Sequence, residues 1–327
     1  MTEITITKKT GPAAARVEKR HPLIEDLSST FRAFVKNKLA LVGFSITMVY
    51  AIITILDYIY PAYLGVSNID KVTSWVPQLF SYPPTPPFVI PSNAPAGAPH
   101  WWYWLGTTGF RLPILPIMLA ALKTDMTFSL AVVLTGLFVG IIVGGVSGYL
   151  GGVVDETLMR ITDIFFSVPS LILAIAFVYV LGYSITNLYF ALVIIWWPIY
   201  ARLTRGVTLT IKSTKFIEAS VASGASKLRI IVKHVLPNTL SPSFVQLSLD
   251  MGTVVIILAA LSYLQLPILS PLIPEIGSMI NTGQVYLAGG AWWPVTVPGV
   301  FLLIFTVAVN LMGDGLRDVL DPKLRGY

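Results

Sequence analysis

"GLFVGIIVGGVSGYLGG", residues 136–152, lies within a run from Met126 to Val154 that contains no charged residue. A helix of about 20 apolar residues spans the hydrocarbon core of a bilayer. Two further uncharged runs, Ile164–Ala201 and Ile276–Gly313, are as long or longer. Only 12% of the residues are charged and the mean hydropathy is +0.76, so a soluble fold is excluded. The sequence predicts an all-α, polytopic membrane protein.

The apolar runs predict six transmembrane helices, at about 39–57, 127–150, 162–181, 187–203, 239–263 and 294–313. Lys and Arg fall almost entirely into alternate connections: the N-terminal arm, the loop near 151–161, the 202–238 region and the tail. The opposite side has only Lys71, Arg111 and Lys123. Because cytoplasmic loops carry the excess of basic residues, both termini are expected in the cytoplasm of a plasma or inner membrane.

The expected organisation has five parts, and the fourth contains a distinct cytoplasmic loop. They are a cytoplasmic arm (1–38), a first span (39–57), an extracytoplasmic loop (58–125), a helical core (126–313) that contains a cytoplasmic loop (213–237), and a cytoplasmic tail (314–327). The outer loop is rich in Pro and aromatic residues, which favours extended backbone over another span. Its aromatic residues suit the lipid headgroup level, or they form a docking surface for an external partner.

Five glycines recur at spacing four in the second predicted span: Gly136, Gly140, Gly144, Gly148 and Gly152. Positions four apart share one helix face, so another helix backbone is expected to pack closely there. Pro169 and Pro198 interrupt the third and fourth predicted spans, and each is expected to kink its helix.

The fifth predicted span carries a polar stripe of residues three or four apart: Thr239, Ser243, Gln246, Asp250 and Thr253. Asp250 lies near the centre, where an ionised carboxylate must face protein or water. One hypothesis is that Ser243, Gln246, Asp250 and Thr253 line a translocation pathway. The alternative is a ladder of hydrogen bonds between helices.

Residues 213–237 are expected to form two short amphipathic helices outside the membrane. Apolar residues follow helical spacing, at Ile217, Val221, Leu228, Ile231, Val232 and Val235. Gly224 breaks the pattern near Ser223, and Pro237 is expected to close it. Such a segment either lies on anionic lipid or fits a groove on a partner protein.

This loop resembles the EAA loop of ABC importer permeases: Glu218-Ala219-Ser220, three residues, Gly224, nine residues, then His234-Val235-Leu236-Pro237. "GYLGGVVDETLMRITDIFFSVPSLILAI", "WWPIYARLTRG" and "NLMGDGLRDVLDP" extend the resemblance to the C-type permease of dipeptide and oligopeptide importers. It implies a type I importer core and a loop that contacts an ATPase subunit. The residues it assigns to that contact are Glu218, Ala219, Ser220, Gly224, Ala225, Ser226, Leu236 and Pro237.

The resemblance also implies a second homologous permease, two ATP-binding subunits and an extracytoplasmic solute-binding protein. The implied cargo is a dipeptide or oligopeptide, with oligosaccharides as the alternative. The chain lacks the G-x-x-x-x-G-K-[ST] phosphate loop, so ATP and Mg²⁺ are expected on the partner subunits, and this chain is expected to be neither an enzyme nor a cofactor or metal carrier. A secondary transporter or channel is the alternative outside the ABC class.

Overall fold

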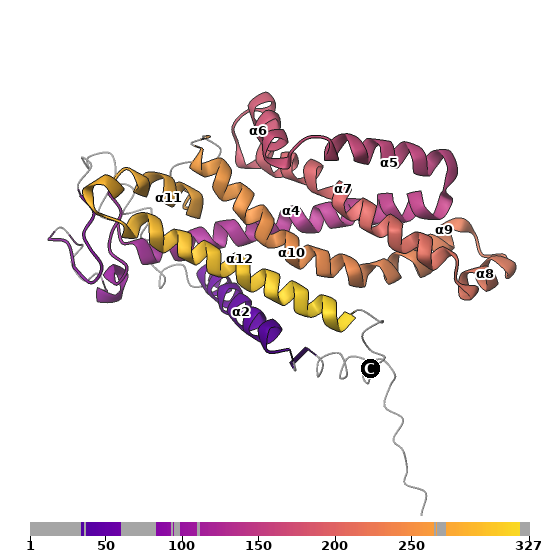
Figure 1. Ribbon diagram of the computed structural model, residues 1–327, viewed down its shortest axis with the longest axis horizontal. Coiled ribbons are helices and arrows are strands. Elements are labelled where there is room, and N and C mark those ends of the chain that lie inside the picture. Colours follow the sequence, from indigo (N-terminus) through magenta and orange to yellow (C-terminus); the bar gives the residue numbers. More distant parts are fainter. Residues whose placement is uncertain are drawn as a thin grey trace, which may run out of the picture.

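The computed structural model describes residues 34–35, 37–59, 83–92, 94, 99–109, 112–264, 266 and 273–320, which are helical throughout their regular structure (Figure 1). The elements are α2 (Lys38–Ile59), η3 (His100–Tyr103), α4 (Ile114–Leu150), α5 (Gly152–Phe166), α6 (Ser170–Leu181), α7 (Ile185–Lys212), α8 (Lys215–Ala222), α9 (Lys227–Ile230), η4 (Ile231–Val235), α10 (Leu236–Tyr263), α11 (Ile276–Gln284), η5 (Leu287–Gly289) and α12 (Trp293–Leu320). The predicted all-α class is confirmed. Most of the predicted arm and the last seven residues of the tail, 321–327, lie outside the described residues, and α12 continues through the first half of the predicted tail.

Among the described residues, four helical segments are long and apolar enough to cross a membrane: α2, α4, the continuous α9–η4–α10 segment and α12. A fifth is present if α5 and α6 together form one broken span. The predicted number of six is not confirmed. The missing one falls in α7, which has the length of a span with 28 residues but mixes Tyr, Trp and Pro with its apolar residues and ends in basic residues.

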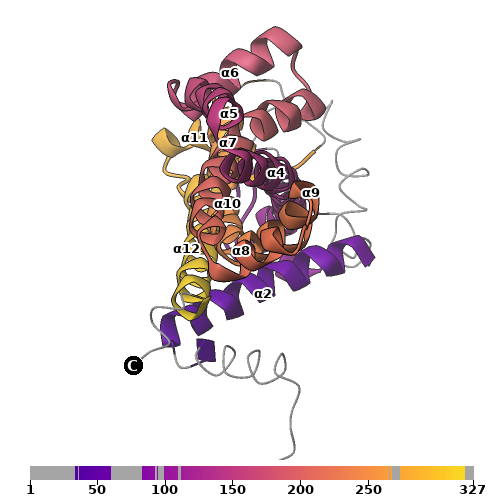
Figure 2. The ribbon, with the colours of Figure 1, turned by 90° about the vertical axis from the view of Figure 1, so that its right-hand side faces the viewer.

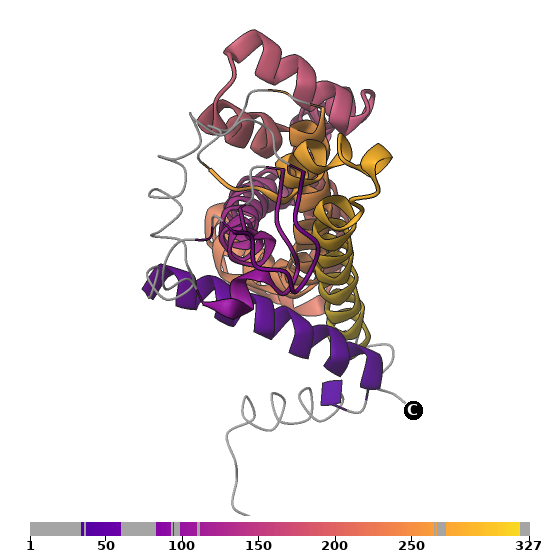
Figure 3. The same ribbon diagram turned by 90° about the vertical axis from the view of Figure 1, so that its left-hand side faces the viewer.

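The long helices α4, α7, α10 and α12 run side by side along the long axis of the molecule (Figure 1). α2 crosses this group obliquely, which is clearest in the two end views (Figures 2 and 3). The short helices α8 and α9 lie at one end of the bundle, whereas α11 and the described part of 83–109 lie at the other (Figure 1). The bundle therefore has two ends of different construction, joined by continuous helices.

The glycines of α4 bring α7 into contact with its backbone. A Cβ added at Gly140 would lie 2.6 Å from the Trp197 carbonyl oxygen, and one at Gly144 would lie 2.2 Å from that of Ala201. Gly136 and Gly148 face the same helix, at Trp196 and Thr208. Gly152 was predicted to share this face, but nothing lies within 4 Å of its would-be Cβ, because α4 ends at Leu150 and the chain turns away.

Pro169 and Pro198 act differently. The predicted span 162–181 is two helices: α5 ends at Phe166, α6 begins at Ser170, and their axes differ by 90°. Pro169 is the N-cap of α6, where it lacks the amide hydrogen that would continue α5. Pro198, in contrast, lies inside the continuous helix α7. One proline therefore breaks a predicted span and the other is tolerated.

Helix α4 begins at Ile114, so the predicted loop does not extend to residue 125. The polar residues near its start are paired or buried and do not end the helix. Lys123 Nζ lies 3.3 Å from Asp57 Oδ2 of α2, and buried Asp125 accepts a 3.4 Å hydrogen bond from the Ile276 amide. At 1.5 Å per residue, the extension from Ile114 to Met126 adds about 18 Å to the helix.

Gly144→Ala is expected to destabilise the protein, because the new Cβ meets the Ala201 backbone, which cannot move aside as a flexible side chain can. Overpacking of this kind costs about 1–3 kcal/mol. Gly206→Ala is the matched control, since Gly206 lies in α7 with nothing within 4 Å and alanine is the better helix former. Thermal midpoints of the purified variants in detergent measure both. Equal midpoints would contradict the backbone contact.

Candidate functional site

The most distinctive exposed element is the α8–α9 hairpin, residues 213–237, at one end of the bundle. It is held to the bundle by a small hydrophobic cluster. Ile217 of α8 is 2% exposed and packs with Tyr149 of α4 and with Ile230, Ile231 and Val235. Leu236 is partly buried against the same cluster. The hairpin is therefore anchored at its base, and its tip projects from the helices.

The turn of the hairpin requires glycine. The Ala225 amide donates to the Ser220 carbonyl at 3.1 Å, and the Gly224 amide donates to the Val221 carbonyl at 2.9 Å. These two bonds are the Schellman pattern that ends a helix, and the residue at its C′ position takes a left-handed conformation. Gly224 occupies that position with φ +79°. Ser226 then begins α9 by accepting a bond from the Arg229 amide.

The structure brings together most of the residues that the sequence assigns to an ATPase contact. Those that are exposed at or near the tip are Glu218, Ala219, Gly224 and Ser226. Ser220 and Ala225 are partly exposed, and the Ser220 hydroxyl donates to the Phe216 carbonyl. Leu236 and Pro237 lie at the base, where Leu236 helps to anchor the hairpin and Pro237 is exposed.

Sequence reasoning missed a set of exposed apolar residues on the hairpin. Val221, Leu228 and Val232 were grouped with the buried residues by spacing, but they are exposed, as is Phe216. Leu228 is the most exposed of them, at 71%. Helical spacing gave no signal of this, because these positions fit the same periodic pattern as the buried ones. An apolar set beside exposed polar residues is typical of a surface that another protein covers.

The predicted end at Pro237 is wrong. α9, the π-helical turn η4 and α10 form one continuous helical segment from Lys227 to Tyr263, and Pro237 lies in the first turn of α10. Proline in a helix interior removes one i→i−4 hydrogen bond. The π-turn at Ile231–Val235, directly before Pro237, changes the hydrogen-bond pattern at that point. The hairpin therefore runs into a bundle helix without a flexible joint.

Two ion pairs hold α5 to α7 near the same end. Arg205 makes a bidentate contact with Asp155, at 2.6 and 2.7 Å, and the Ser147 hydroxyl donates to the same carboxylate. Arg202 contacts Asp163 at 2.6 Å, but both of these side chains are about half exposed. The Arg205–Asp155 ion pair is the stronger of the two because its contact is bidentate and partly buried.

The polar stripe of α10 is turned mostly toward the interior. Ser243 and Asp250 are buried, Gln246 is partly buried, and Thr253 is exposed. Gln246 Nε2 donates to Asp250 Oδ1 at 3.0 Å. Trp196 and Tyr200 of α7 interact with the same carboxylate, although neither reaches hydrogen-bond geometry. Thr239, the first member of the stripe, is fully buried.

A model of the family described as "binding-protein-dependent transport system inner membrane component" matches residues 136–326. This match covers more than half of the chain. The chain belongs to this family. The resemblance found in the EAA loop is thereby confirmed at the family level, and the family is that of a membrane permease subunit and not of an enzyme.

Curated relatives agree. The chain is 33% identical to a dipeptide transport system permease protein of Alkalihalophilus pseudofirmus, over 96% of this chain and 95% of the relative. It is 37% identical to a probable D,D-dipeptide transport system permease protein of Escherichia coli, over 71% of this chain and 76% of the relative. It is 35% identical to a nickel transport system permease protein of the same species, over 69% of this chain and 81% of the relative.

Among solved structures, the chain is similar to one titled "Inward facing conformations of the MetNI methionine ABC transporter: CY5 SeMet soak crystal form". The TM-score is 0.51 at 22% identity, covering 63% of this chain and 98% of the other. This likeness supports the permease fold. In the part of the chain that the structure describes, no group of three or more His, Asp or Glu side chains is placed to hold a metal ion.

Gly224→Ala is expected to loosen the hairpin turn, because a non-glycine residue in the left-handed region costs about 1–2 kcal/mol. Gly224→Asn is the control, since asparagine tolerates this conformation better. Hydrogen exchange of residues 215–226 measures the effect: exchange should be about fivefold or more faster in the alanine variant, with protection of α4 unchanged. Equal exchange rates in the two variants would contradict the assignment of the turn.

Proposed function

We propose that this chain is one of two permease subunits of an ATP-driven, binding-protein-dependent importer for dipeptides or oligopeptides. The observation that carries the proposal is the α8–α9 hairpin, with its anchored base and exposed tip, in a chain of this permease family. The partners proposed are a second, homologous permease, two ATP-binding subunits and an extracytoplasmic binding protein. ATP and Mg²⁺ belong to the ATP-binding subunits, and both termini of this chain belong in the cytoplasm.

The cargo follows from the relatives named above, which transport dipeptides in two cases. None of these relatives is named for sugar transport, so the predicted oligosaccharide alternative is not favoured, and the nickel permease at 35% identity makes nickel the second candidate cargo. Reconstitution of the complete importer in proteoliposomes tests the proposal. ATP-dependent uptake of a labelled dipeptide with its binding protein supports it; uptake of a nickel complex but no peptide would reassign the cargo.

The proposed importer core is the predicted 126–313 extended to the start of α4 at Ile114, and 213–237 is its ATPase-coupling loop. The tip residues Glu218, Ala219, Ser220, Gly224, Ala225 and Ser226, with Leu236 and Pro237 at the base, are proposed to form or support the ATPase contact. The exposed apolar residues Phe216, Val221 and Leu228 extend the contact beyond the predicted set. An apolar set flanked by polar residues matches the composition of a protein–protein interface more closely than that of a solvated helix.

Glu218→Arg is expected to lower binding-protein-stimulated ATP hydrolysis of the reconstituted importer at least about tenfold, because a charge is reversed within the contact. Glu156→Arg is the matched control: Glu156 is also an exposed carboxylate, but it lies on α5 outside the hairpin. Leu228→Asp should weaken copurification of the ATP-binding subunits. If the two hairpin variants keep wild-type ATP hydrolysis and wild-type copurification of the ATP-binding subunits, the hairpin is not part of the ATPase contact.

We infer that the polar stripe of α10 lines the translocation pathway when the helices part. Ser243 and Asp250 are buried in the present arrangement, so opening must separate α10 from α7 to expose them. The chain contains no cysteine, which makes single substitutions clean probes.

Cysteines at Ser243, Gln246, Asp250 and Thr253 should react with an aqueous thiol reagent in a way that depends on ATP. A cysteine at Val254, which is fully buried next to the stripe, is the control and should stay unreactive. If Ser243→Cys and Asp250→Cys stay unreactive with and without ATP, the stripe is an interhelical hydrogen-bond ladder and not a pathway.

A further inference from the structure

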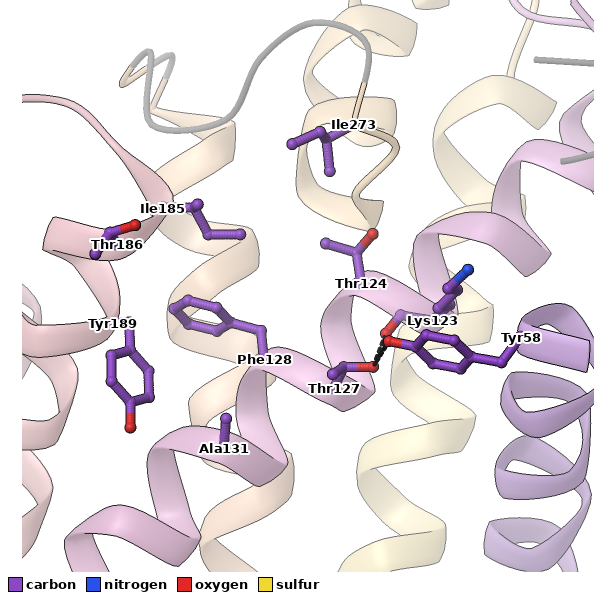
Figure 4. Close-up of a pocket in the computed structure, with 10 residues that line it drawn as sticks. All are labelled: Tyr58, Lys123, Thr124, Thr127, Phe128, Ala131, Ile185, Thr186, Tyr189 and Ile273. Carbon is purple, nitrogen blue, oxygen red and sulfur yellow. Dashed lines mark hydrogen bonds between the residues drawn. The ribbon is translucent and has the colours of Figure 1, made fainter. Parts of the chain in front are cut away.

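A cavity of about 440 Å³ opens between α2, α4 and the start of α7, near the end of the bundle opposite the hairpin (Figure 4). Tyr58 and Lys123 line one side, Ile185, Thr186 and Tyr189 line the other, and Phe128 and Ala131 of α4 form the floor between them. The volume is within the range of small-molecule sites. None of the residues assigned to coupling or to the pathway takes part in it.

The cavity lies where two helices change from apolar to polar. Asp57 and Tyr58 are among the last residues of α2, which ends at Ile59. Lys123 is the last basic residue of α4 before the uncharged run that begins at Met126. Aromatic and basic residues at the ends of apolar helices mark the level of the lipid headgroups. The cavity is therefore at a membrane–water boundary.

The polar groups of the cavity leave donors free for a ligand. Lys123 Nζ lies 3.3 Å from buried Asp57 and 4.2 Å from the centre of the Tyr58 ring, and its side chain is 27% exposed. An ammonium has three hydrogens, so this ion pair does not use them all. The Thr127 hydroxyl donates to the Lys123 carbonyl at 2.6 Å and is contacted by the Tyr58 hydroxyl at 3.1 Å.

Two further hydroxyls remain. Thr124 is next to Lys123 on α4, whereas Thr186 lies across the cavity on α7. Lys123 and Thr124 together offer a cation and a hydroxyl on one side of the cavity, which suits an anionic oxygen group such as a phosphate.

Beyond the cavity, α4 exposes a row of apolar side chains on the face that includes Thr127. Leu130, Leu134 and Phe138 of α4 are 40%, 43% and 68% exposed. Their spacing of four places them on one helix face with Thr127. This face runs about 12 Å from Leu130 to Phe138, toward the middle of the membrane span. A cationic group at the boundary therefore lies next to an exposed apolar face of α4.

We propose that this cavity binds one phospholipid, with its phosphate on Lys123 and Thr124 and one acyl chain along Leu130, Leu134 and Phe138. The polarity gradient follows the direction of a lipid in the membrane, which a water-soluble cargo does not require. A basic group between membrane helices that meets a lipid headgroup is a known mode of lipid recognition. The proposal does not depend on the cargo or on the ATPase contact.

Native mass spectrometry of the purified importer complex, titrated with phosphatidylglycerol in detergent, tests the proposal. Ala131→Phe fills the floor of the cavity and should remove one tightly bound lipid per copy of this chain, a loss of about tenfold or more in affinity. The matched control is Ala176→Phe, because Ala176 is an exposed alanine of α6 outside the cavity. It should bind lipid as the wild type does.

A second variant distinguishes a loss of lipid binding from a loss of folding. Asp57→Asn with Lys123→Gln removes the ion pair without leaving a buried charge, and it should weaken lipid binding while the complex stays assembled. Unchanged lipid binding in both this variant and Ala131→Phe would overturn the proposal. Displacement of the lipid by equal concentrations of glycerol 3-phosphate would instead indicate a free-phosphate site, and displacement by trialanine a cargo site. Loss of the second permease in both variants, but not in Ala176→Phe, would make the cavity a subunit interface.

Discussion

The contact between the backbones of α4 and α7 is the constraint on which the rest of the structure depends. Apolar side chains are as favourable in contact with lipid tails as with each other. Helices therefore associate in a membrane through close packing and not through a hydrophobic driving force. Gly140 and Gly144 allow α7 to reach the α4 backbone itself. Once these two helices are fixed, α4 sets one end of the bundle through Lys123 and Asp125, and α7 sets the opposite end through Arg205 and the hairpin that follows it.

The hairpin depends on this base. Ile217 is buried because Tyr149, at the end of α4, packs in the same cluster as Val235, the last residue of η4. Gly145 also faces α10, since a Cβ there would lie 2.7 Å from the Leu236 side chain. Gly145, which follows Gly144 of the face that contacts α7, therefore lets the base of the hairpin approach α4 closely. The anchored base keeps the exposed apolar tip in a fixed position relative to both long helices.

Much of this could be predicted from the sequence, because it depends on local patterns. Spacing of four between glycines identifies a packing face, and Gly224 with its neighbours identifies a turn. Two of the failures arose because a local signal does not show which contacts a residue makes elsewhere in the fold. Lys123 and Asp125 suggested a loop, but Asp57 and the Ile276 amide stabilise them within a helix. Val221 and Leu228 matched the helical pattern but are exposed. Only Ile217 of α8 and the buried residues Ile230, Ile231 and Val235 pack against the bundle.

The two kinds of contact made by α7 differ in how easily they can change. Its contact with α4 is backbone against backbone, and a shift of even a fraction of an ångström meets carbonyl oxygens. Its contact with α10 includes polar side chains, where Trp196 and Tyr200 face Asp250 without completing hydrogen bonds. A buried donor and acceptor that are not yet paired leave room for more than one arrangement of similar energy. Because α9 continues through η4 into α10 without a break, the hairpin and α10 share one continuous helical segment, whereas the backbone contact between α4 and α7 leaves little room for adjustment.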